Sequence, residues 1–384
     1  MTARVYVHVG PHKTGTTFLQ QTLATNKDAL AAAGVLFPGR DYADHLAAVL
    51  DALGRGVPGD RRRVRGRWAA VAEEVRAWPG GTAVLSAEAL AGAGAAGIER
   101  LVTSLQPAQV HVVYTARDLT RVIPAMWQTH MRSRVSEPWP GYLASVRGDA
   151  GADPKWGERL WNTQDPRRVF ARWERHVPRE RIHVVTVPPS GADPGVLWER
   201  FCSLVGVDPT AYPLTQGRAN TSLGTAESEV LRRVNAKVAG RLRDGSYHRW
   251  VNEFTTRRVL KKRPGQTRFA LPAEEHGWVR ERAEQVIAFL EADGYDVVGD
   301  LADLLPAPPS PDAAAPDDVD LDRALDAAAD VVAALLRQLE AATGPPERTG
   351  VRSSSAAVAR RVRSTAAAAL GRRSGRPARW RSRR

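Results

Sequence analysis

The sequence predicts an α/β fold in which a parallel β-sheet is flanked by helices, and two observations predict it. Four short apolar runs have the length and the β-branched composition of buried strands; they cover residues 4–9, 82–88, 110–116 and 181–187. Segments with helical spacing of apolar residues lie between them, and this alternation is typical of a parallel sheet covered on both faces. Because ligands bind such sheets at the carboxyl ends of the strands, the candidate functional residues are those that follow a strand.

The remaining elements follow from apolar spacing and from the Pro and Gly residues at segment ends. In chain order, helices are expected over residues 16–33, 61–78, 118–134, 165–177 and 197–206, and one more short strand is expected over 35–38. The last of these helices contains Cys202, the single cysteine, in an amphipathic pattern that favours packing over chemistry. Beyond residue 225 we expect only helices, which complete the same domain.

The composition divides the chain into four parts. An α/β domain over 1–304 is followed by a Pro/Ala/Asp linker over 305–317, an amphipathic helix over 318–342 and an Arg-rich tail over 343–384. The tail has few large apolar residues and is expected to be disordered. The helix before it could pair with a copy of itself.

The net charge of +13 belongs mostly to the tail, because residues 346–384 hold twelve arginines and one acidic residue, Glu347. The body of the chain is therefore not an overall basic nucleic-acid binder. The tail favours an anionic partner such as a membrane surface, a glycan or nucleic acid, and the alternative is non-specific attraction.

Nothing in the sequence predicts insertion into a membrane or export. No apolar run is long enough for a transmembrane helix, and residues 1–10 lack the basic and apolar regions of a secretory signal. A single cysteine allows no intrachain disulfide, which fits a reducing interior. We expect a cytoplasmic protein, with the inner membrane face as a second location.

The turn after the first strand has the features of an anion site. Residues 10–17 read GPHKTGTT and run into the first helix. The first amides of a helix are unpaired and its dipole is positive there, so the turn can hold an anion with backbone groups alone. Gly10 and Gly15 allow close approach of a ligand, Thr16 and Thr17 can cap the helix and bind the anion, and Lys13 adds a full charge. Loops that bind nucleoside triphosphates have the lysine after the last glycine, whereas Lys13 precedes Gly15.

This order resembles the P-K-[ST]-G-T-T-[WF]-L loop of the sulfotransferases that depend on 3′-phosphoadenosine 5′-phosphosulfate (PAPS), with His12 inserted before the lysine. The resemblance covers residues 4–300 and implies a P-loop-like sulfotransferase fold of bacterial type. It also implies that the loop binds the 5′-phosphosulfate of PAPS. The residues that correspond to this loop are His12, Lys13, Thr14, Gly15, Thr16 and Thr17.

The segment VVYTARDLTRVIPAMWQ, residues 112–128, is similar to the 3′-phosphate motif of the same family. Arg117 and Trp127 match the motif, and Ala125 stands where the family has serine. Arg121, Gln128 and Thr129 are candidates to replace that serine. A late basic loop closes the cofactor site in the family, and residues 217–224 or 261–269 could supply it, the alternative being a solvated basic loop.

Sulfuryl transfer to a hydroxyl needs a group that takes the proton, and three residues are candidates. Glu88 follows the second long strand, resembles the glutamate base of glycan sulfotransferases, and could have its pKa raised by burial. The alternative for Glu88 is a helix-start residue stabilised by the dipole. His45 is a candidate because the cytosolic sulfotransferases use histidine, whereas His12 is expected to tune cofactor binding. No metal cluster is expected from the histidine spacing.

The sequence therefore predicts a PAPS-dependent sulfotransferase whose acceptor is a small molecule, a glycan or a lipid. Lys13, Glu88 and His45 are the catalytic candidates, and Arg117 is the candidate ligand of the 3′-phosphate. The tryptophans of and beside an irregular stretch over 134–164 are expected to pack in the core, and the alternative is that the stretch forms a lid. Two other readings remain open: a nucleotide-dependent kinase with Asp118 as the magnesium ligand, and a non-catalytic binding protein, which Ala125 favours.

Overall fold

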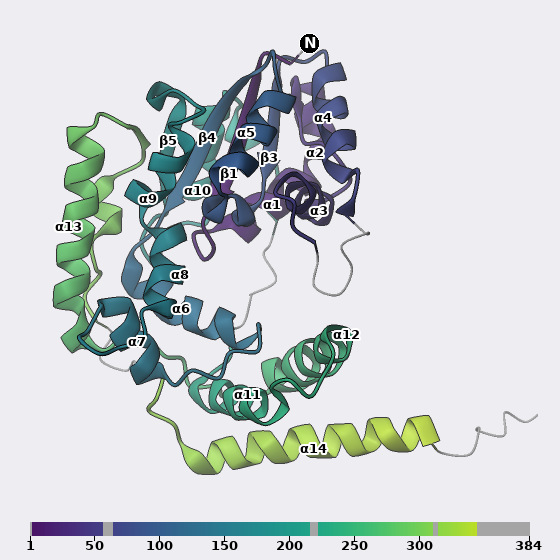
Figure 1. The fold of residues 1–384 in the computed structure, drawn as a ribbon, viewed down its shortest axis with the longest axis vertical. Coiled ribbons are helices and arrows are strands. Elements are labelled where there is room, and N and C mark those ends of the chain that lie inside the picture. Colours follow the sequence, from purple (N-terminus) through teal and green to yellow (C-terminus); the bar gives the residue numbers. More distant parts are fainter. Residues whose placement is uncertain (1, 57–63, 216–221, 310–313, 344–384) are drawn as a thin grey trace, which may run out of the picture. The chain divides into compact units, whose positions relative to one another are not determined.

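A six-stranded parallel sheet forms the centre of the computed structural model (Figure 1), with the strands in the order β2-β3-β1-β4-β5-β6. The structure describes residues 2–56, 64–215, 222–309 and 314–343. The strands are β1 (Arg4–Gly10), β2 (Val35–Leu36), β3 (Thr82–Ser86), β4 (Gln109–Ala116), β5 (Ile182–Thr186) and β6 (Asp296–Val298). Val7 of β1 lies opposite Leu85 of β3 and Val112 of β4. This register brings the carboxyl ends of β1, β3 and β4 to one edge of the sheet.

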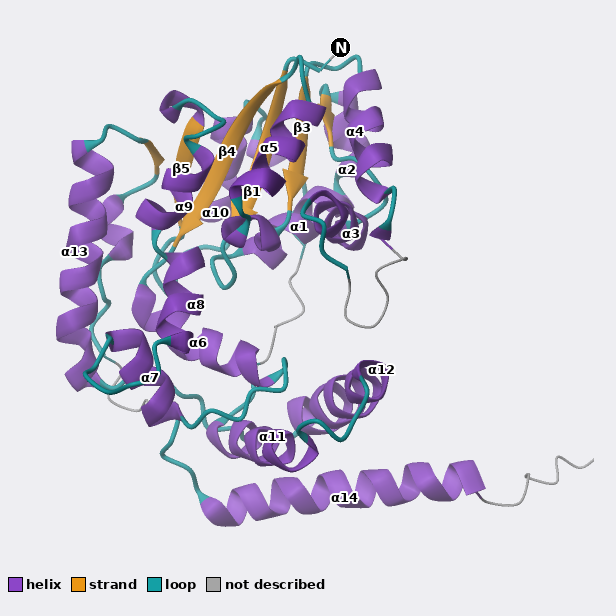
Figure 2. Cartoon of the chain, in the orientation of Figure 1, coloured by secondary structure: helices purple, strands orange, loops and turns teal. Residues whose placement is uncertain are grey.

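Helices cover both faces of the sheet (Figure 2). The α-helices of the described residues, on the sheet and beyond it, are α1 (Thr16–Thr25), α2 (Lys27–Ala32), α3 (Tyr42–Ala52), α4 (Arg67–Ala77), α5 (Ala95–Ser104), α6 (Leu119–Met131), α7 (Trp139–Arg147), α8 (Lys155–Gln164), α9 (Pro166–Trp173), α10 (Gly195–Val205), α11 (Thr225–Val238), α12 (Asp244–Tyr247), α13 (His276–Ala292) and α14 (Leu321–Thr343). Shorter helical segments include η2 (Glu88–Gly92), the π-helical η5 (His248–Val259), which continues α12, and η6 (Leu260–Lys262).

The two faces of the sheet follow from alternation along β1. Val5, Val7 and Val9 are buried in one cluster with side chains of α3, α4, α5, α9 and α13. Tyr6 points to the other face, where α1, α2 and α10 supply the apolar partners. Since successive side chains of a strand point to opposite faces, the parallel sheet is buried on both sides, as its apolar strands predict.

A third apolar cluster joins side chains of α6, α7, α8, α11, α13 and the start of α14. It contains Trp127, Trp139, Trp156 and Trp161, all of which are buried. The indole nitrogen of Trp127 donates to the carbonyl of Glu137 at 2.9 Å. The expectation of core packing is therefore confirmed, and the alternative of an irregular lid over 134–164 is wrong, because most of this stretch forms α7 and α8.

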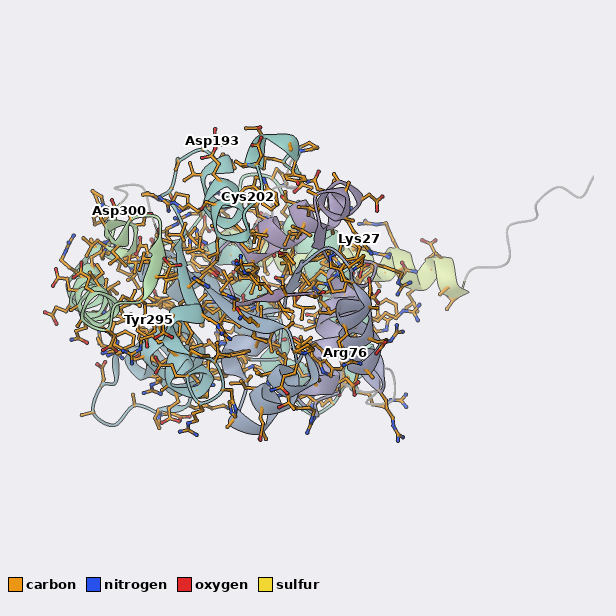
Figure 3. The ribbon with its side chains drawn as sticks, turned by 90° about the horizontal axis from the view of Figure 1, so that it is seen from above. Lys27, Arg76, Asp193, Cys202, Tyr295 and Asp300 are labelled. Atoms are coloured by element: carbon orange, nitrogen blue, oxygen red, sulfur yellow. The ribbon has the colours of Figure 1, made fainter. Side chains whose placement is uncertain are left out.

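Most of the predicted elements are confirmed, with two differences. The expected helix over 16–33 is divided at Asn26 into α1 and α2. A sixth strand, β6, pairs with β5 although no strand was expected after residue 225. Cys202 is buried in α10, and burial raises the pKa of its thiol to about 12, in agreement with a packing role (Figure 3).

The chain forms two compact units, Met1–Val331 and Val332–Arg384. The first unit extends past the expected linker, since Ala314 forms a bridge with Phe269 and both Ala327 and Val331 are buried in the third cluster. The tail predicted to be disordered lies outside the described residues from position 344 on. Within the described part of the chain, no helix has the length and apolar character needed to cross a membrane.

Candidate anion-binding site

The turn between β1 and α1 presents a run of backbone amides. Those of residues 13–17 have no hydrogen-bond acceptor among the residues that the structure describes. Lys13 and Gly15 both have left-handed backbone conformations, with φ of 71° and 82°. Turns that mix left- and right-handed residues point successive amides into one concavity, and such concavities bind anions. A left-handed lysine is also strained, and such strain clusters at ligand sites.

Two glycines let this turn lie against the protein. A Cβ at Gly10, whose φ is 84°, would be 3.1 Å from both Cα and Cβ of Glu88. A Cβ at Gly15 would collide with the side chain of Leu197. Gly15 is also the N-cap of α1, and no side chain caps this helix. The prediction that Thr16 and Thr17 cap α1 is therefore wrong, and the first amides of the helix stay open.

A buried polar network supports the turn from below. His8 on β1 contacts the hydroxyl of Ser86 at 2.8 Å through Nδ1 and that of Thr115 at 3.3 Å through Nε2. Thr115 in turn meets the hydroxyl of Thr14 at 2.5 Å, and Thr14 donates to the carbonyl of Pro11 at 2.6 Å. Burial lowers the pKa of His8 to about 4, so its ring is neutral at pH 7. The hydroxyl of Thr14, a predicted cofactor ligand, is therefore used to hold the turn in place.

His8 and Thr115 are functional residues that were not predicted from the sequence. The available signal was a polar residue inside each of two apolar strands, His8 in RVYVHV and Thr115 in VHVVYTA. A buried polar side chain requires hydrogen-bond partners, and these two residues satisfy each other.

Lys13 lies among cations. Burial lowers the pKa of its amine to about 8, and the charges of Arg132, Lys261 and Arg117 act in the same direction. Arg132 is exposed and Lys261 is half-buried, and neither forms an ion pair with another described residue. Lys261 belongs to the basic stretch 261–269 that was a candidate for the late loop, and its charge acts on the amine of Lys13. Most of the other candidate loop, residues 216–221, lies outside the described residues.

Arg117 follows β4 and is tied to the same turn. Its Nη1 donates to the carbonyl oxygen of Lys13 at 2.7 Å, and its Nε is buried with no acceptor among the described residues. Burial lowers the pKa of Arg117 to about 10, and Arg121 adds to the effect. Asp118 does not pair with Arg117, because its carboxylate accepts from the amide of Thr120 at 2.8 Å and caps α6.

The three candidates to replace the family serine at Ala125 are engaged elsewhere. Arg121 donates to the carbonyl of Pro188 at 3.0 Å, and Gln128 donates to that of Leu223 at 2.9 Å. Thr129 donates to the carbonyl of Ala125 itself at 2.9 Å. Arg117 therefore remains the candidate ligand of the 3′-phosphate, and none of these three residues of α6 has been shown to be a second ligand.

Glu88 begins η2 at the end of β3, directly beside the turn. Its Oε1 accepts from the hydroxyl of Thr16 at 2.8 Å, and its Oε2 accepts from the hydroxyl of Tyr42 at 2.6 Å. Burial acts to raise the pKa of this carboxyl, but the charge of His12 and the bonds from Tyr42 and Thr16 outweigh it, and the pKa is lowered. The expectation of a pKa raised towards neutrality is wrong, because two hydroxyl donors compensate for the lost solvent.

His12 stands at the mouth of the turn, with a side chain that is 46% exposed. Its Nδ1 lies 3.8 Å from Oε1 of Glu88, and its backbone carbonyl accepts from Gln164 at 2.8 Å. Burial of part of the ring lowers the pKa of His12, Glu88 opposes this, and Lys13 adds to the lowering. The imidazole is therefore neutral at pH 7 and can accept a proton.

His45, in contrast, is a core residue of α3 that is only 1% exposed. Its Nε2 donates to the carbonyl of Pro38 at 2.6 Å, and its Nδ1 accepts from the amide of Ser86 at 3.2 Å. Burial lowers the pKa of His45 to about 4. Both nitrogens are used to hold the end of β3, so the ring has no open position for an acceptor.

Comparison with solved structures finds likenesses of fold. No protein-family model and no curated protein matches the chain. The crystal structure of a sulfotransferase from Alicyclobacillus acidocaldarius is similar in fold, with 15% identity and a TM-score of 0.36, over 66% of this chain and 97% of that one.

Proposed function

We propose that the chain is a sulfotransferase that takes its sulfuryl group from PAPS and transfers it to a hydroxyl or amine of an acceptor. The observation that carries the proposal is the run of open amides over 13–17, which surrounds Lys13 in a turn of mixed handedness. This turn suits a tetrahedral oxyanion such as phosphate or sulfate.

The residues at the turn fit such a donor. The amides over 13–17 and the exposed hydroxyl of Thr17 would hold the phosphosulfate, and Arg117 would reach the 3′-phosphate. When bound, PAPS supplies the sulfuryl group, while the acceptor oxygen bonds to sulfur as the bond from sulfur to the phosphate oxygen breaks. Lys13 offsets the negative charge that develops on that departing oxygen. Although its pKa is lowered to about 8, the amine of Lys13 is charged in most molecules at pH 7.

His12 is the proposed proton acceptor, with Glu88 as its partner. The ring is neutral at pH 7 and its Nε2 has no partner among the described residues, so it can take the acceptor proton. Glu88 stays ionised and lies 3.8 Å from Nδ1, where its charge stabilises the imidazolium that results. Glu88 alone is a weaker base, because both of its oxygens accept hydrogen bonds and its pKa is lowered.

The kinase alternative needs a carboxylate for magnesium. Asp118 was its candidate, but both carboxylate oxygens accept hydrogen bonds from Thr120, at 2.7 and 2.8 Å. Its carboxyl group is therefore committed to the start of α6. The non-catalytic alternative still rests on Ala125, and the same experiment separates all three readings.

Calorimetric titration of the full chain with adenosine 3′,5′-bisphosphate, ADP and magnesium-ATP tests the proposal. We expect micromolar binding of the bisphosphate alone, lost in Lys13→Ala and retained in Lys237→Ala, which removes an exposed lysine on α11. Preference for magnesium-ATP would support the kinase. Binding of the bisphosphate without sulfuryl transfer from PAPS to any of a panel of hydroxyl acceptors would support the binding protein.

A further inference from the structure

Helix α14 carries an apolar stripe that no described residue covers. Leu321, Leu325, Val332, Leu336 and Leu339 are 64%, 69%, 56%, 60% and 59% exposed. Their spacings of 4, 7, 4 and 3 residues place all five along one side of the helix. Among the described residues outside α14, Leu214, at 39%, is the one large aliphatic residue that is exposed. A continuous apolar stripe of this kind marks an interaction surface.

The start of α14 is fixed to the first compact unit by other side chains. Ala327 and Val331 are buried in the third cluster. Asp330 forms an ion pair with Arg263, and Arg323 donates to a backbone carbonyl, that of Gly265. The stripe is therefore not the face that the helix uses to join the rest of its own unit.

The charged residues of α14 lie on a separate side of the helix. Asp322, Asp326, Arg337 and Glu340 fall together on a helical projection, away from the stripe. A helix divided in this way can lie flat at a boundary between an apolar and an aqueous phase, with its acidic side in water.

The chain that follows the helix adds a strong positive charge. Residues 344–384 contain twelve arginines, one acidic residue and Trp380. A net charge of +11 directly after an apolar stripe complements an anionic surface. One apolar segment alone binds a bilayer weakly, and stable attachment generally needs a second signal such as a basic cluster.

We propose that the stripe of α14 is the docking surface of a peripheral anchor for a bilayer that contains anionic phospholipids, as the positive charge of the sequence that follows indicates. The aliphatic side chains enter the headgroup boundary, and the arginines pair with lipid phosphates. A second copy of the chain would also cover the stripe, but its tail has the same positive charge. The net charge of +11 on residues 344–384 would then have no oppositely charged partner. Of these two partners, only a bilayer with anionic lipids accounts for both the apolar stripe and the positive charge of the tail.

Sedimentation of the full chain with lipid vesicles tests the anchor. We expect binding to vesicles of equal parts phosphatidylcholine and phosphatidylglycerol, little binding to phosphatidylcholine alone, and weakening at high salt. The triple variant Leu325→Ser, Leu336→Ser, Leu339→Ser should bind at least about tenfold more weakly, as should Arg372→Gln with Arg373→Gln, Arg379→Gln and Arg381→Gln. Leu214→Ser is the matched control and should bind as the unmodified chain does.

Three outcomes would overturn the proposal. The triple leucine variant could bind the anionic vesicles as well as the unmodified chain, which would leave the stripe without a part in binding. The unmodified chain could fail to bind the vesicles and be a dimer by light scattering, while the leucine variant is a monomer. A second copy of the chain would then be the partner that covers the stripe. Equal binding of a random DNA duplex by the unmodified chain and the leucine variant, with no vesicle binding, would assign the tail to nucleic acid. Far-ultraviolet circular dichroism checks that each variant keeps its helix content.

Discussion

Arg117 donates a hydrogen bond from Nη1 to the backbone carbonyl of Lys13 at 2.7 Å. The bond ties the end of β4 to a residue of the turn that is left-handed without being glycine. Because the carbonyl and the next amide of a trans peptide point in opposite directions, holding the carbonyl of Lys13 aims the amide of Thr14 away from Arg117. Arg117 thus shapes the turn as well as adding charge.

Replacement of Arg117 should therefore weaken anion binding through two effects. A hydrogen bond from a charged donor contributes about 1.5–3 kcal/mol, so Arg117→Ala should lower the affinity for adenosine 3′,5′-bisphosphate by roughly tenfold to a hundredfold. Arg117→Lys keeps the charge but loses the planar donor group and should recover only part of the affinity. Calorimetry measures both variants.

Arg121→Ala is the control for this prediction, since Arg121 donates to the carbonyl of Pro188 instead of the turn. It should change the affinity by less than about threefold. Unchanged affinity in Arg117→Ala would show that the turn keeps its shape and its ligand without that bond.

The lowered pKa of Lys13 predicts how affinity depends on pH. The free protein loses the charge of Lys13 as the pH rises through about 8, whereas a bound anion keeps the amine protonated. The affinity for the bisphosphate should therefore fall above about pH 8, by at most about tenfold per pH unit. Titrations between about pH 7.5 and about pH 9.5, where the phosphates are fully ionised, measure this slope. Lys13→Arg should flatten the slope, and a flat profile in the unmodified chain would contradict a role for the Lys13 charge.

Tyr42 is predicted to keep Glu88 ionised. Its hydroxyl donates to Oε2 of Glu88 at 2.6 Å and is one reason that the pKa of Glu88 is lowered. Tyr42→Phe should raise this pKa and move the acidic limb of the pH–rate profile to higher pH. It should also reduce the free energy of unfolding by about 1–3 kcal/mol, because a buried carboxylate loses a donor.

Tyr142→Phe is the matched control for Tyr42→Phe. The hydroxyl of Tyr142 is also buried, but it has no hydrogen-bond partner among the described residues. Its removal should leave the unfolding free energy and the acidic limb unchanged. Equal effects of the two substitutions would mean that the bond to Glu88 does not control its protonation.

Local pattern is the reason that the sheet and the position of the turn between β1 and α1 could be predicted. The turn is contiguous with β1, and the backbone requirements of an anion site appear within residues 10–17. The support of the turn could not be predicted, because His8, Thr14 and Thr115 meet only when β1 and β4 pair in the observed register. The lowered pKa of Glu88 has the same origin, since its donor Tyr42 comes from a distant helix.

The stretch over 134–164 shows the opposite effect, because its turn-forming residues made two regular helices look irregular in the sequence. Its Pro, Gly and Asp residues indicate turns, and they do separate α7 from α8. Each helix is too short to show a clear apolar period, and its tryptophans are explained only by the neighbouring helices of the third cluster. Strand β6 was missed because it has three residues at the edge of the sheet and begins with an aspartate.

The buried histidines predict a loss of stability in mild acid. Burial lowers the pKa values of His8 and His45 to about 4, whereas the unfolded chain protonates near the ordinary value of 6.5. Between these pH values the unfolded state binds more protons, so the free energy of unfolding should be full above about pH 6.5 and fall as the pH approaches 4. Urea unfolding at about pH 7.5 and about pH 5 measures this difference. His45→Gln should reduce it and His248→Gln, an exposed control, should not; equal midpoints at the two pH values would contradict the prediction.

Gly10 offers a test of how closely the turn lies against Glu88. Gly10 and Gly66 have nearly the same φ, 84° and 81°, so alanine at either position carries a left-handed cost of about 1–2 kcal/mol. A Cβ at Gly66 would meet no atom of the described residues within 4 Å, whereas one at Gly10 would lie 3.1 Å from Cα and Cβ of Glu88. Gly10→Ala should therefore destabilise the chain by about 1–3 kcal/mol more than Gly66→Ala, which is the range for overpacking a tight site. It should also weaken bisphosphate binding, because the turn must move away from Glu88, while Gly66→Ala should leave the affinity unchanged. Equal urea midpoints and equal affinities for the two variants would show that the turn can move away from Glu88 without cost and that its close packing is not needed for the anion site.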